Sequence, residues 1–393
     1  MHQTISPLIQ ALIKKGVQMP NPESVFIDDD VDPDRISGDG VVIHTGCKIH
    51  GSESFILRDA VIGSEGPVTI NNCHIGPEVK LKSGYINNSV LLKKASIGSG
   101  AHVREGTILE EEASIAHTVG LKQTILFPFV TLGSLINFCD CLMTGGTSRK
   151  DHSEVGSSFI HFNYTPNQDK ATPSLLGDVP HGVMLNQQPI FLGGQGGLVG
   201  PCRLAFGTVT AAGTIYRKDE LRPNRLLIER GGKGGSIPFK PGRYQNSERI
   251  INNNIIYIAN LIALRQWYFN VRQLFISNDF PETLLEGLKS NIDLAIAERI
   301  KRLKDYFGNL PDKKQTAQWN DLEDNLNQCQ TFGGEHGQRD NFLKKISKKI
   351  DQDGTDYITI IKNLEPNLTE AGTAWLQGIV EYVSKKSGNI ISF

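Results

Sequence analysis

Large apolar residues recur at every sixth position through the middle of the chain. The step runs without a miss through Leu91, Ile97, Val103, Leu109, Ile115, Leu121 and Phe127. An α-helix repeats its apolar face about every 3.6 residues, and a half-buried strand repeats it at every second residue. A strict step of six is therefore typical of neither element alone, and it predicts a solenoid.

Smaller residues repeat on the same step. Each stands four positions after an apolar residue: Ala95, Ala101, Thr107, Ala113, Val119 and Ile125. Glycines at 98, 100 and 106 supply turns between them. This combination is the hexapeptide repeat of a parallel β-helix, in which three short strands form one triangular coil and stacked coils enclose a narrow core.

The extent of the six-residue step sets the expected domain limits. The step begins near Val41, is interrupted at Pro67, and weakens between residues 130 and 175, where loops are expected to leave the coil. It returns at Leu192, Leu198, Leu204, Thr210 and Tyr216. We predict a β-helix over 41–220, preceded within 1–40 by a short helix that ends at Gly16 and a cap over the first coil.

The pattern changes again after the last coil. Residues 221–246 are rich in glycine, proline and basic residues, which indicates a linker. Beyond them apolar residues step by threes and fours, first over 251–275 and then over 285–307, with further helical segments near 341–350 and 367–385. The predicted fold class is thus an all-β solenoid followed by an all-α C-terminal domain over 247–393.

Composition narrows the partners and the compartment. Lys and Arg number 41 against 42 Asp and Glu, so the net charge gives no reason to expect nucleic acid or an anionic membrane as partner. The N-terminal residues lack the features of a signal peptide, and no run approaches 18 apolar residues. Six scattered cysteines form no CxxC pair. We expect a cytoplasmic protein with free thiols.

Several segments between residues 162 and 219 occur together in one known family. They are FNY at 162–164, KAT at 170–172, LLGDV at 175–179, FLGGQGGLVGP at 191–201 and TAAGTIYRKD at 210–219. In this order they resemble the acetyltransferase half of the bacterial bifunctional N-acetylglucosamine-1-phosphate uridylyltransferase/glucosamine-1-phosphate acetyltransferases (GlmU-like proteins). The resemblance implies a left-handed winding and a homotrimer that binds its ligands between adjacent prisms.

Two departures from this family are visible in the sequence. Hexapeptide sequence begins where the family's N-terminal nucleotidyltransferase domain would still continue, so uridylyltransferase activity is not expected. About 11 residues, PHGVMLNQQPI at 180–190, are inserted between two of the matching segments. We expect this insertion to change one rim of the ligand groove.

The resemblance also implies roles for individual residues. Asn163 and Tyr164 match the pair that holds the amino-sugar phosphate, and Lys170 matches, displaced by one residue, a phosphate-contacting lysine. Lys218, with Arg217 beside it, matches a basic residue that contacts coenzyme A. An amide and a phenol can bond sugar hydroxyls, and a lysine can pair with a phosphate.

The family's catalytic histidine has no direct counterpart, because Pro128 stands in its place. Acetylation of an amine requires a base, and a neutral imidazole suits this role near pH 7. The two candidates are His161, two residues before Asn163, and His152 on the aperiodic segment. Arg149 on the same segment is a candidate contact for an anionic substrate.

These features favour an acyltransferase within UDP-N-acetylglucosamine metabolism. It would use acetyl-CoA or another acyl-CoA as co-substrate and an amino-sugar phosphate or nucleotide amino sugar as acceptor.

Two alternative functions remain beside the acyltransferase. A trimeric prism could hold zinc as γ-class carbonic anhydrases do, but the donors His102, His117, His152 and His161 match no compact ligand motif, so no metal is predicted. The other is a non-catalytic scaffold or sugar-nucleotide-binding protein with a degenerate site.

Overall fold

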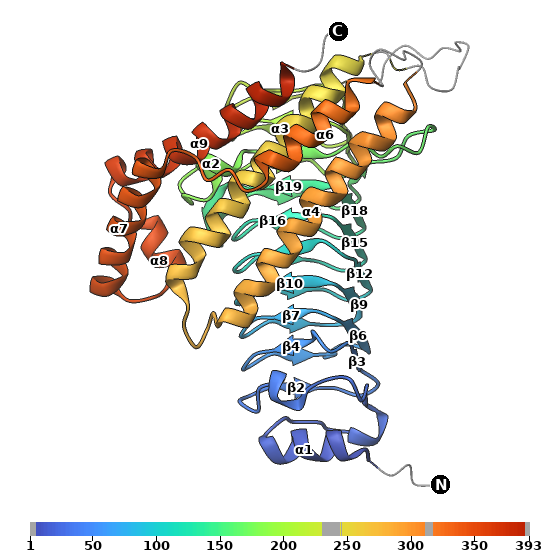
Figure 1. Cartoon of the computed structure of the whole chain (residues 1–393). Helices are drawn as coiled ribbons and strands as arrows, with labels where there is room; N and C mark the ends of the chain where they lie inside the picture. Colours follow the sequence, from blue (N-terminus) through green and yellow to red (C-terminus); the bar gives the residue numbers. More distant parts are fainter. Residues whose placement is uncertain (1–4, 230–243, 245, 311–316, 390–393) are drawn as a thin grey trace.

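The structure, a computed structural model, describes residues 5–229, 244, 246–310 and 317–389. Its N-terminal half is a stack of coils whose strands form three parallel sheets (Figure 1). A coil passes through the sheets in the order I, II, III, so the prism has three ridges, named here I/II, II/III and III/I. The predicted parallel β-helix is confirmed.

Sheet I contains β1 (Phe26–Ile27), β3 (Lys48–His50), β6 (Val68–Asn71), β9 (Gly84–Asn87), β12 (Ala101–Val103), β15 (Val119–Lys122), β18 (Ile136–Cys139), β23 (Ile160–Phe162), β26 (Gly197–Val199) and β29 (Ile215–Tyr216). Sheet II contains β4 (Phe55–Ile56), β7 (His74–Ile75), β10 (Ser89–Leu91), β13 (Thr107–Leu109), β16 (Ile125–Leu126), β19 (Cys141–Met143), β24 (Ser174–Leu176) and β27 (Arg203–Leu204). Sheet III contains β2 (Val42–Ile43), β5 (Val61–Ile62), β8 (Lys80–Leu81), β11 (Ser96–Ile97), β14 (Ser114–Ile115), β17 (Thr131–Leu132), β22 (Glu154–Val155), β25 (Phe191–Leu192), β28 (Val209–Thr210) and β30 (Leu226–Leu227). A hairpin of β20 (Gly146–Ser148) and β21 (Asp151–His152) leaves the coil at ridge II/III.

The six-residue step corresponds to the interior side chain of each strand. Leu91 pairs with Leu109, Ile97 with Ile115 and Val103 with Leu121, and all of these side chains are buried. The register differs from the sequence expectation in two places. In the first coils the six-residue step from Ile49 reaches Phe55 and Val61, but Ile56 and Ile62 are the buried residues. Later, Leu109 pairs with Leu126 and not with Phe127. The turn before β16 is one residue shorter than the turn before β13, which shifts the interior position by one.

The β-helix extends beyond its predicted limits at both ends. The first strand, β1, lies within the segment expected as a cap, and the last, β30, lies within the segment expected as a linker. Most of that expected linker, 230–243 and 245, lies outside the described residues. The predicted first helix is confirmed as α1 (Pro7–Lys15), which begins after the Ser6 cap and ends at Gly16 in a left-handed conformation. Short 3₁₀ turns follow at Pro22–Ser24 and Pro33–Arg35.

The predicted helical domain is also confirmed. Its helices are α3 (Ser247–Gln266), continued by a π-helical turn (Trp267–Val271) and a 3₁₀ turn (Arg272–Phe275), α4 (Glu282–Gly308), α6 (Trp319–Cys329), α7 (His336–Asp353), α8 (Tyr357–Lys362) and α9 (Pro366–Gly388). A short helix, α2 (Val179–Gly182), leaves the β-helix and contacts α3 and α9. Among the helices of the described residues, none combines the length and the apolarity needed to cross a bilayer.

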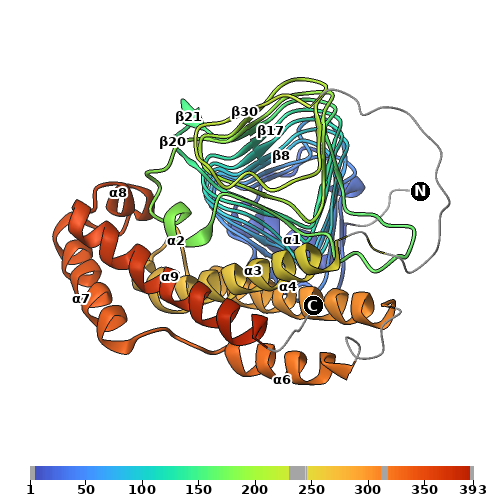
Figure 2. The same cartoon turned by 90° about the horizontal axis from the view of Figure 1, so that it is seen from above.

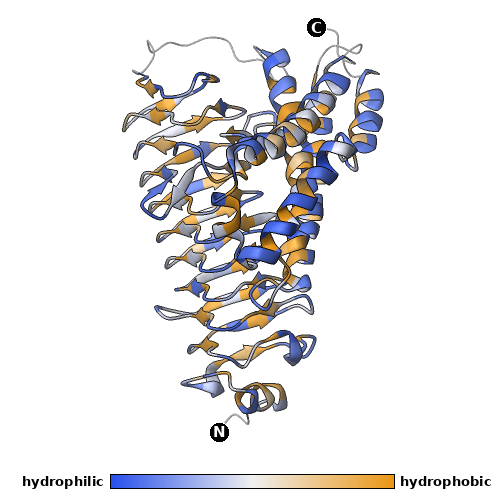
Figure 3. Cartoon of the chain, turned by 90° about the vertical axis from the view of Figure 1, so that its left-hand side faces the viewer, coloured by the Kyte–Doolittle hydropathy of each residue, from blue (hydrophilic) through white to orange (hydrophobic). Residues whose placement is uncertain are grey.

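The helical domain covers sheet II, and no helix of the described residues covers sheet I or sheet III (Figure 2). The long helix α4 runs across β7, β10 and β13, while α3 contacts β24 and α9 packs on α3. In Figure 3 much of the apolar colour follows the strands of the stack and the helical segments beside it. Burial of these facing apolar side chains is what joins the two parts of the chain.

Buried polar pairs also cross this interface. Arg272, which follows α3, forms an ion pair with Glu111, and the Tyr268 hydroxyl donates to Glu110. Both acceptors lie in the turn after β13, at ridge II/III. Burial, assisted by the neighbouring Glu111, raises the pKa of Glu110 to about 7. Two adjacent buried carboxyl groups are therefore held by different partners, Glu111 by Arg272 and Glu110 by Tyr268.

This arrangement predicts a specific pH dependence of stability. The pKa of Glu110 is higher in the folded chain than its ordinary value of 4.5, so the folded state retains a proton that the unfolded state releases. This contribution to stability should be complete below pH 4.5 and should fall, by up to about 1.4 kcal/mol per pH unit, as the pH rises towards 7. Glu110→Gln should remove that slope in urea unfolding followed between pH 5 and 8. Glu112→Gln, on the same turn, is the control, and an unchanged slope in Glu110→Gln would contradict the assignment.

Candidate functional site

Near the C-terminal end of the stack, the turn at ridge I/II is enlarged into a loop. In one coil, β18 and β19 are separated by Asp140 alone, which adopts a left-handed backbone with φ 59°. In the next coil the chain leaves β23 and returns at β24 only after the segment 163–173. This segment, here called the ridge loop, carries Asn163, Tyr164 and Lys170.

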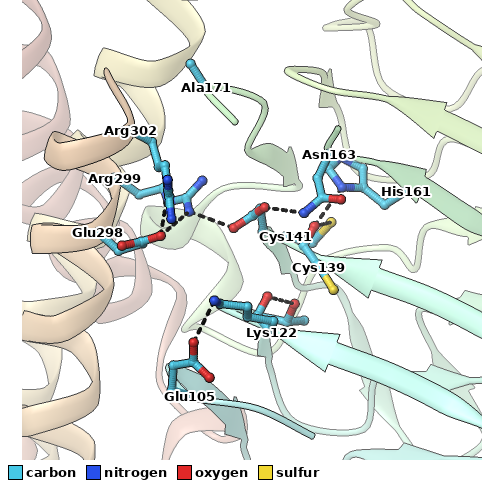
Figure 4. A network of polar contacts seen from close by, with 12 residues as sticks. Glu105, Lys122, Cys139, Cys141, His161, Asn163, Ala171, Glu298, Arg299 and Arg302 are labelled. Atoms are coloured by element: carbon cyan, nitrogen blue, oxygen red, sulfur yellow. Dashed lines mark hydrogen bonds and ion pairs between the residues drawn. The ribbon is translucent and has the colours of Figure 1, made fainter. Parts of the chain in front are cut away.

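His161 lies inside the prism beneath the ridge loop (Figure 4). Its ring is 1% exposed, with Nδ1 2.7 Å from the Cys139 carbonyl oxygen and Nε2 2.7 Å from the Ser174 hydroxyl. Because a carbonyl only accepts, Nδ1 carries the proton and Nε2 accepts from Ser174. Burial lowers the pKa of His161 to about 4, so the ring is neutral and neither nitrogen is available to a ligand.

Asn163 takes part in a polar chain that reaches the helical domain (Figure 4). Its side-chain amide donates to Asp140 Oδ2 at 2.5 Å, and Asp140 Oδ1 is 2.6 Å from a guanidinium nitrogen of Arg299 on α4. The Asp140 and Arg299 side chains are 5% and 2% exposed. One coil towards the N-terminus, Lys122 and Glu105 form a further ion pair at 2.6 Å. Neither Asp140 nor Arg299 belongs to a sequence motif, so their pairing could not be predicted from the sequence.

The other residues carried over from the resemblance lie on the same ridge. Tyr164 is 68% exposed and Lys170 is half-buried. Arg217 and Lys218 follow β29, two coils beyond β23 in the order of sheet I, which places them roughly 10 Å along the ridge. Arg217 donates to the Ile215 carbonyl oxygen and lies 3.8 Å from Glu229, whereas Lys218 is exposed.

His152 and Arg149 lie elsewhere, on the hairpin at ridge II/III. One Arg149 nitrogen donates to the carbonyl oxygens of Glu112 and Phe129 and to the Thr131 hydroxyl, at 2.9–3.0 Å, and so fastens the hairpin to the coils below. His152 Nε2 is 3.8 Å from Glu154. Within one chain, sheet II separates these two residues from Asn163.

The third ridge, III/I, has a groove of about 780 Å³ over the middle coils. Lys80, Lys82 and His117 are among the residues that line it. His117 is exposed, its Nδ1 lies 2.8 Å from the Ser134 hydroxyl, and its other ring nitrogen has no hydrogen-bond partner among the described residues. Sequence reasoning weighed His117 only as a metal donor, because a six-residue repeat does not reveal which corner histidine has a free nitrogen. In the described ranges no three His, Cys, Asp or Glu side chains gather to hold a metal ion.

Two further sequence expectations concern groups near the site. The inserted segment 180–190 does not lie at ridge I/II: α2 begins it, and Val183, Met184 and Leu185 are buried against the helical side.

All six cysteines are free and buried, as expected. Burial raises the pKa of Cys139 to about 11, which keeps this thiol protonated at neutral pH.

The chain is similar to curated proteins named bifunctional protein GlmU, which confirms the resemblance. It is 29% identical to that of Pelobacter propionicus over 209 residues, 53% of this chain and 40% of the relative. The relative from Fervidobacterium nodosum is 28% identical over 220 residues, 56% and 43% of the two chains. The relative from Staphylococcus haemolyticus is 27% identical over 215 residues, 55% and 42%. The chain thus spans less than half the length of these relatives, and no protein-family model matches it.

The contacts predict a large difference in reactivity between two histidines. Diethyl pyrocarbonate acylates an unprotonated ring nitrogen that solvent can reach, so at pH 7 His117 should react at least about tenfold faster than His161. Peptide mass spectrometry over a time course measures both rates in one sample. The unfolded protein in urea is the control, in which the two rates should converge. Equal rates in the folded protein would mean that His161 is accessible.

Proposed function

We propose that the protein transfers an acyl group from an acyl-CoA to the amine of an amino-sugar phosphate or nucleotide amino sugar. The observation that carries the proposal is the gathering of Asn163, Tyr164 and Lys170 with Arg217 and Lys218 along one ridge. The similarity to bifunctional protein GlmU supports it. Asn163 and Tyr164 would bond sugar hydroxyls, Lys170 the phosphate, and Arg217 and Lys218 the phosphates of coenzyme A.

The reaction is a direct displacement at the thioester. The acceptor nitrogen attacks the carbonyl carbon, a C–N bond forms, and the C–S bond breaks. A base removes the proton from nitrogen, and the coenzyme A thiolate leaves and takes up a proton. The base must offer a free lone pair close to the amine.

The hydrogen bonds at His161 and the position of His152 on ridge II/III favour His117 as this base. The acceptor nitrogen of His161 is already occupied by Ser174, and a group whose pKa is near 4 is a weak base at pH 7. His152 lies on the opposite ridge of sheet II. His117 has a free nitrogen at a groove that Lys80 also lines, together with Lys82, which pairs with Glu65 at 2.6 Å.

His117 and Asn163 lie on different ridges and two coils apart, roughly 10 Å along the stack, so the proposed site would span these coils between chains of a homotrimer. The helices cover sheet II, which leaves ridge III/I as the edge available for self-association (Figure 2). Leu135 at this ridge is 55% exposed. The last coils of sheet III add the exposed ladder Phe191, Val209 and Leu226. Sheet I of one copy would then face sheet III of the next across a groove.

A second function, ligand binding without catalysis, is favoured by the surroundings of the ridge loop. His161 is sealed inside the prism, and helices of the same chain contact the ridge loop. A sugar-nucleotide-binding scaffold needs Asn163, Tyr164 and Lys170 but no base.

Thiol release from acetyl-CoA, measured across amino-sugar 1-phosphates and nucleotide amino sugars, tests the proposed reaction. Release should require a sugar amine. His117→Ala should lower kcat by at least about a hundredfold, the usual contribution of a general base, and His152→Ala should leave it within about twofold. His161→Ala should mainly lower the melting temperature, because two buried hydrogen bonds are lost.

Two results would change this assignment. Loss of release in His161→Ala or His152→Ala, with His117→Ala active, would move the base to that residue. If no acceptor stimulates release and acetyl-CoA does not bind, the protein is no acyltransferase. Binding of a nucleotide sugar alone would then support the scaffold.

The shared site also predicts an effect of charge at ridge III/I. Leu135→Glu places a carboxylate where the copies would meet, so the mass from light scattering should change from that of a trimer to that of a monomer. Leu294→Glu, which alters an exposed leucine on α4, is the matched control and should stay trimeric. A monomeric parent protein would refute the trimer directly.

A further inference from the structure

The ridge loop is fastened to the helical domain along its length. Asn309, just after α4, donates to the Asn167 carbonyl oxygen at 3.1 Å. Tyr244, just before α3, donates its hydroxyl to the buried Asp169 carboxylate at 2.6 Å. Asn254 on α3 donates to the Ala171 carbonyl oxygen at 2.9 Å. These contacts come from segments far apart in the sequence, and they hold the end of the loop that leads into β24.

The beginning of the loop is held differently, through the buried ion pair. Asp140 has no direct bond to the loop backbone; one carboxylate oxygen receives the Asn163 amide and the other receives Arg299 (Figure 4). Burying a carboxylate until it is 5% exposed is costly unless a cation and hydrogen bonds compensate the lost hydration. Arg299 therefore compensates the buried carboxylate and fixes its orientation, and Asp140 in turn fixes Asn163.

We infer that the helical domain is a wall of the site and that Arg299 is the positioning residue for Asn163. This inference rests on the proposed function, because it gives the helical domain a role at that same site. The fastening uses only the amide nitrogen of Asn163, so its carbonyl oxygen, together with the Tyr164 and Lys170 side chains, is left to meet the acceptor. Arg299 acts through Asp140 and does not itself contact the acceptor.

A neighbouring arginine supplies a matched control. Arg302 lies on the same helix and is labelled beside Arg299 in Figure 4. It pairs with Glu298 at 2.7 Å and Asp305 at 3.3 Å and makes no direct bond to Asp140. Arg302→Met thus removes an equal charge from α4 and no atom of the Arg299–Asp140–Asn163 chain, although its partner Glu298 also lies 3.9 Å from Arg299.

Hydrogen–deuterium exchange tests the positioning without any need for activity. In Arg299→Met the amides of 163–173 should exchange at least about tenfold faster than in the parent, whereas in Arg302→Met they should not change. Arg299→Lys keeps the charge and should restore most of the protection. Unchanged exchange in a folded Arg299→Met would overturn the inference.

Because Arg299→Met leaves a buried carboxylate unpaired, it could fail to fold. Tyr244→Phe keeps the ring and removes only the bond to Asp169, so it serves as the second variant. It should raise exchange at 168–171 by at least about threefold with an unchanged melting temperature. Exchange that stays at the parent rate there would equally contradict a loop held by the helical domain.

Kinetics then separate this inference from the proposed function. If the parent is active, Arg299→Met should raise the KM for the acceptor by at least about tenfold and leave the KM for acetyl-CoA within about twofold. Equal effects on both substrates would indicate general loss of structure and would refute the positioning role. An inactive parent whose ridge loop loses protection in Arg299→Met would disprove the acyltransferase and retain the positioning of Asn163.

Discussion

The structure depends on one steric constraint, the narrow interior of a triangular coil. Each strand of two to four residues has room for about one large side chain directed inwards, so every face of every coil must supply one. Stacked parallel strands align these side chains into continuous columns such as Leu91, Leu109 and Leu126. Any residue added to a coil must therefore leave it as a loop, and this is how the hairpin at ridge II/III and the ridge loop arise.

The same constraint applies only to the side chains that point inwards. The outward side chains of the three sheets can therefore differ from sheet to sheet while the interior stays the same. Sheet II packs against helices, and the contact combines apolar burial with buried polar pairs. On burial these side chains lose their hydration, and a few specific partners replace it: Tyr268 for Glu110, Arg272 for Glu111 and Arg299 for Asp140. Replacing one partner leaves a charge without compensation, so these pairs specify one way of placing the helices on the prism. That placement brings α3 and α4 to ridge I/II.

The candidate site follows from this placement. The residues that resemble those of GlmU-like proteins converge at ridge I/II, but the histidine beside them is sealed and supports the strands. A histidine with a free nitrogen occurs on another ridge, which is why the proposed chemistry requires a second copy of the chain. The helical domain closes one side of the ridge loop, and the exposed apolar residues of sheet III and of ridge III/I are the surface proposed to contact that copy.

The sequence by itself determined the parts that rest on local periodicity. The six-residue step identified the β-helix and its interior residues, and the change to a step of threes and fours identified the helices, because both periods follow directly from backbone geometry. The six-residue step did not reveal that the turn before β16 is one residue shorter, because an apolar residue also stands at the expected position. Only the tertiary structure decided that sheet II is the covered face, that both nitrogens of His161 are bonded, and that Arg299 reaches Asp140 across 159 positions. These outcomes depend on which distant surfaces meet, and no local pattern in the chain encodes such a meeting.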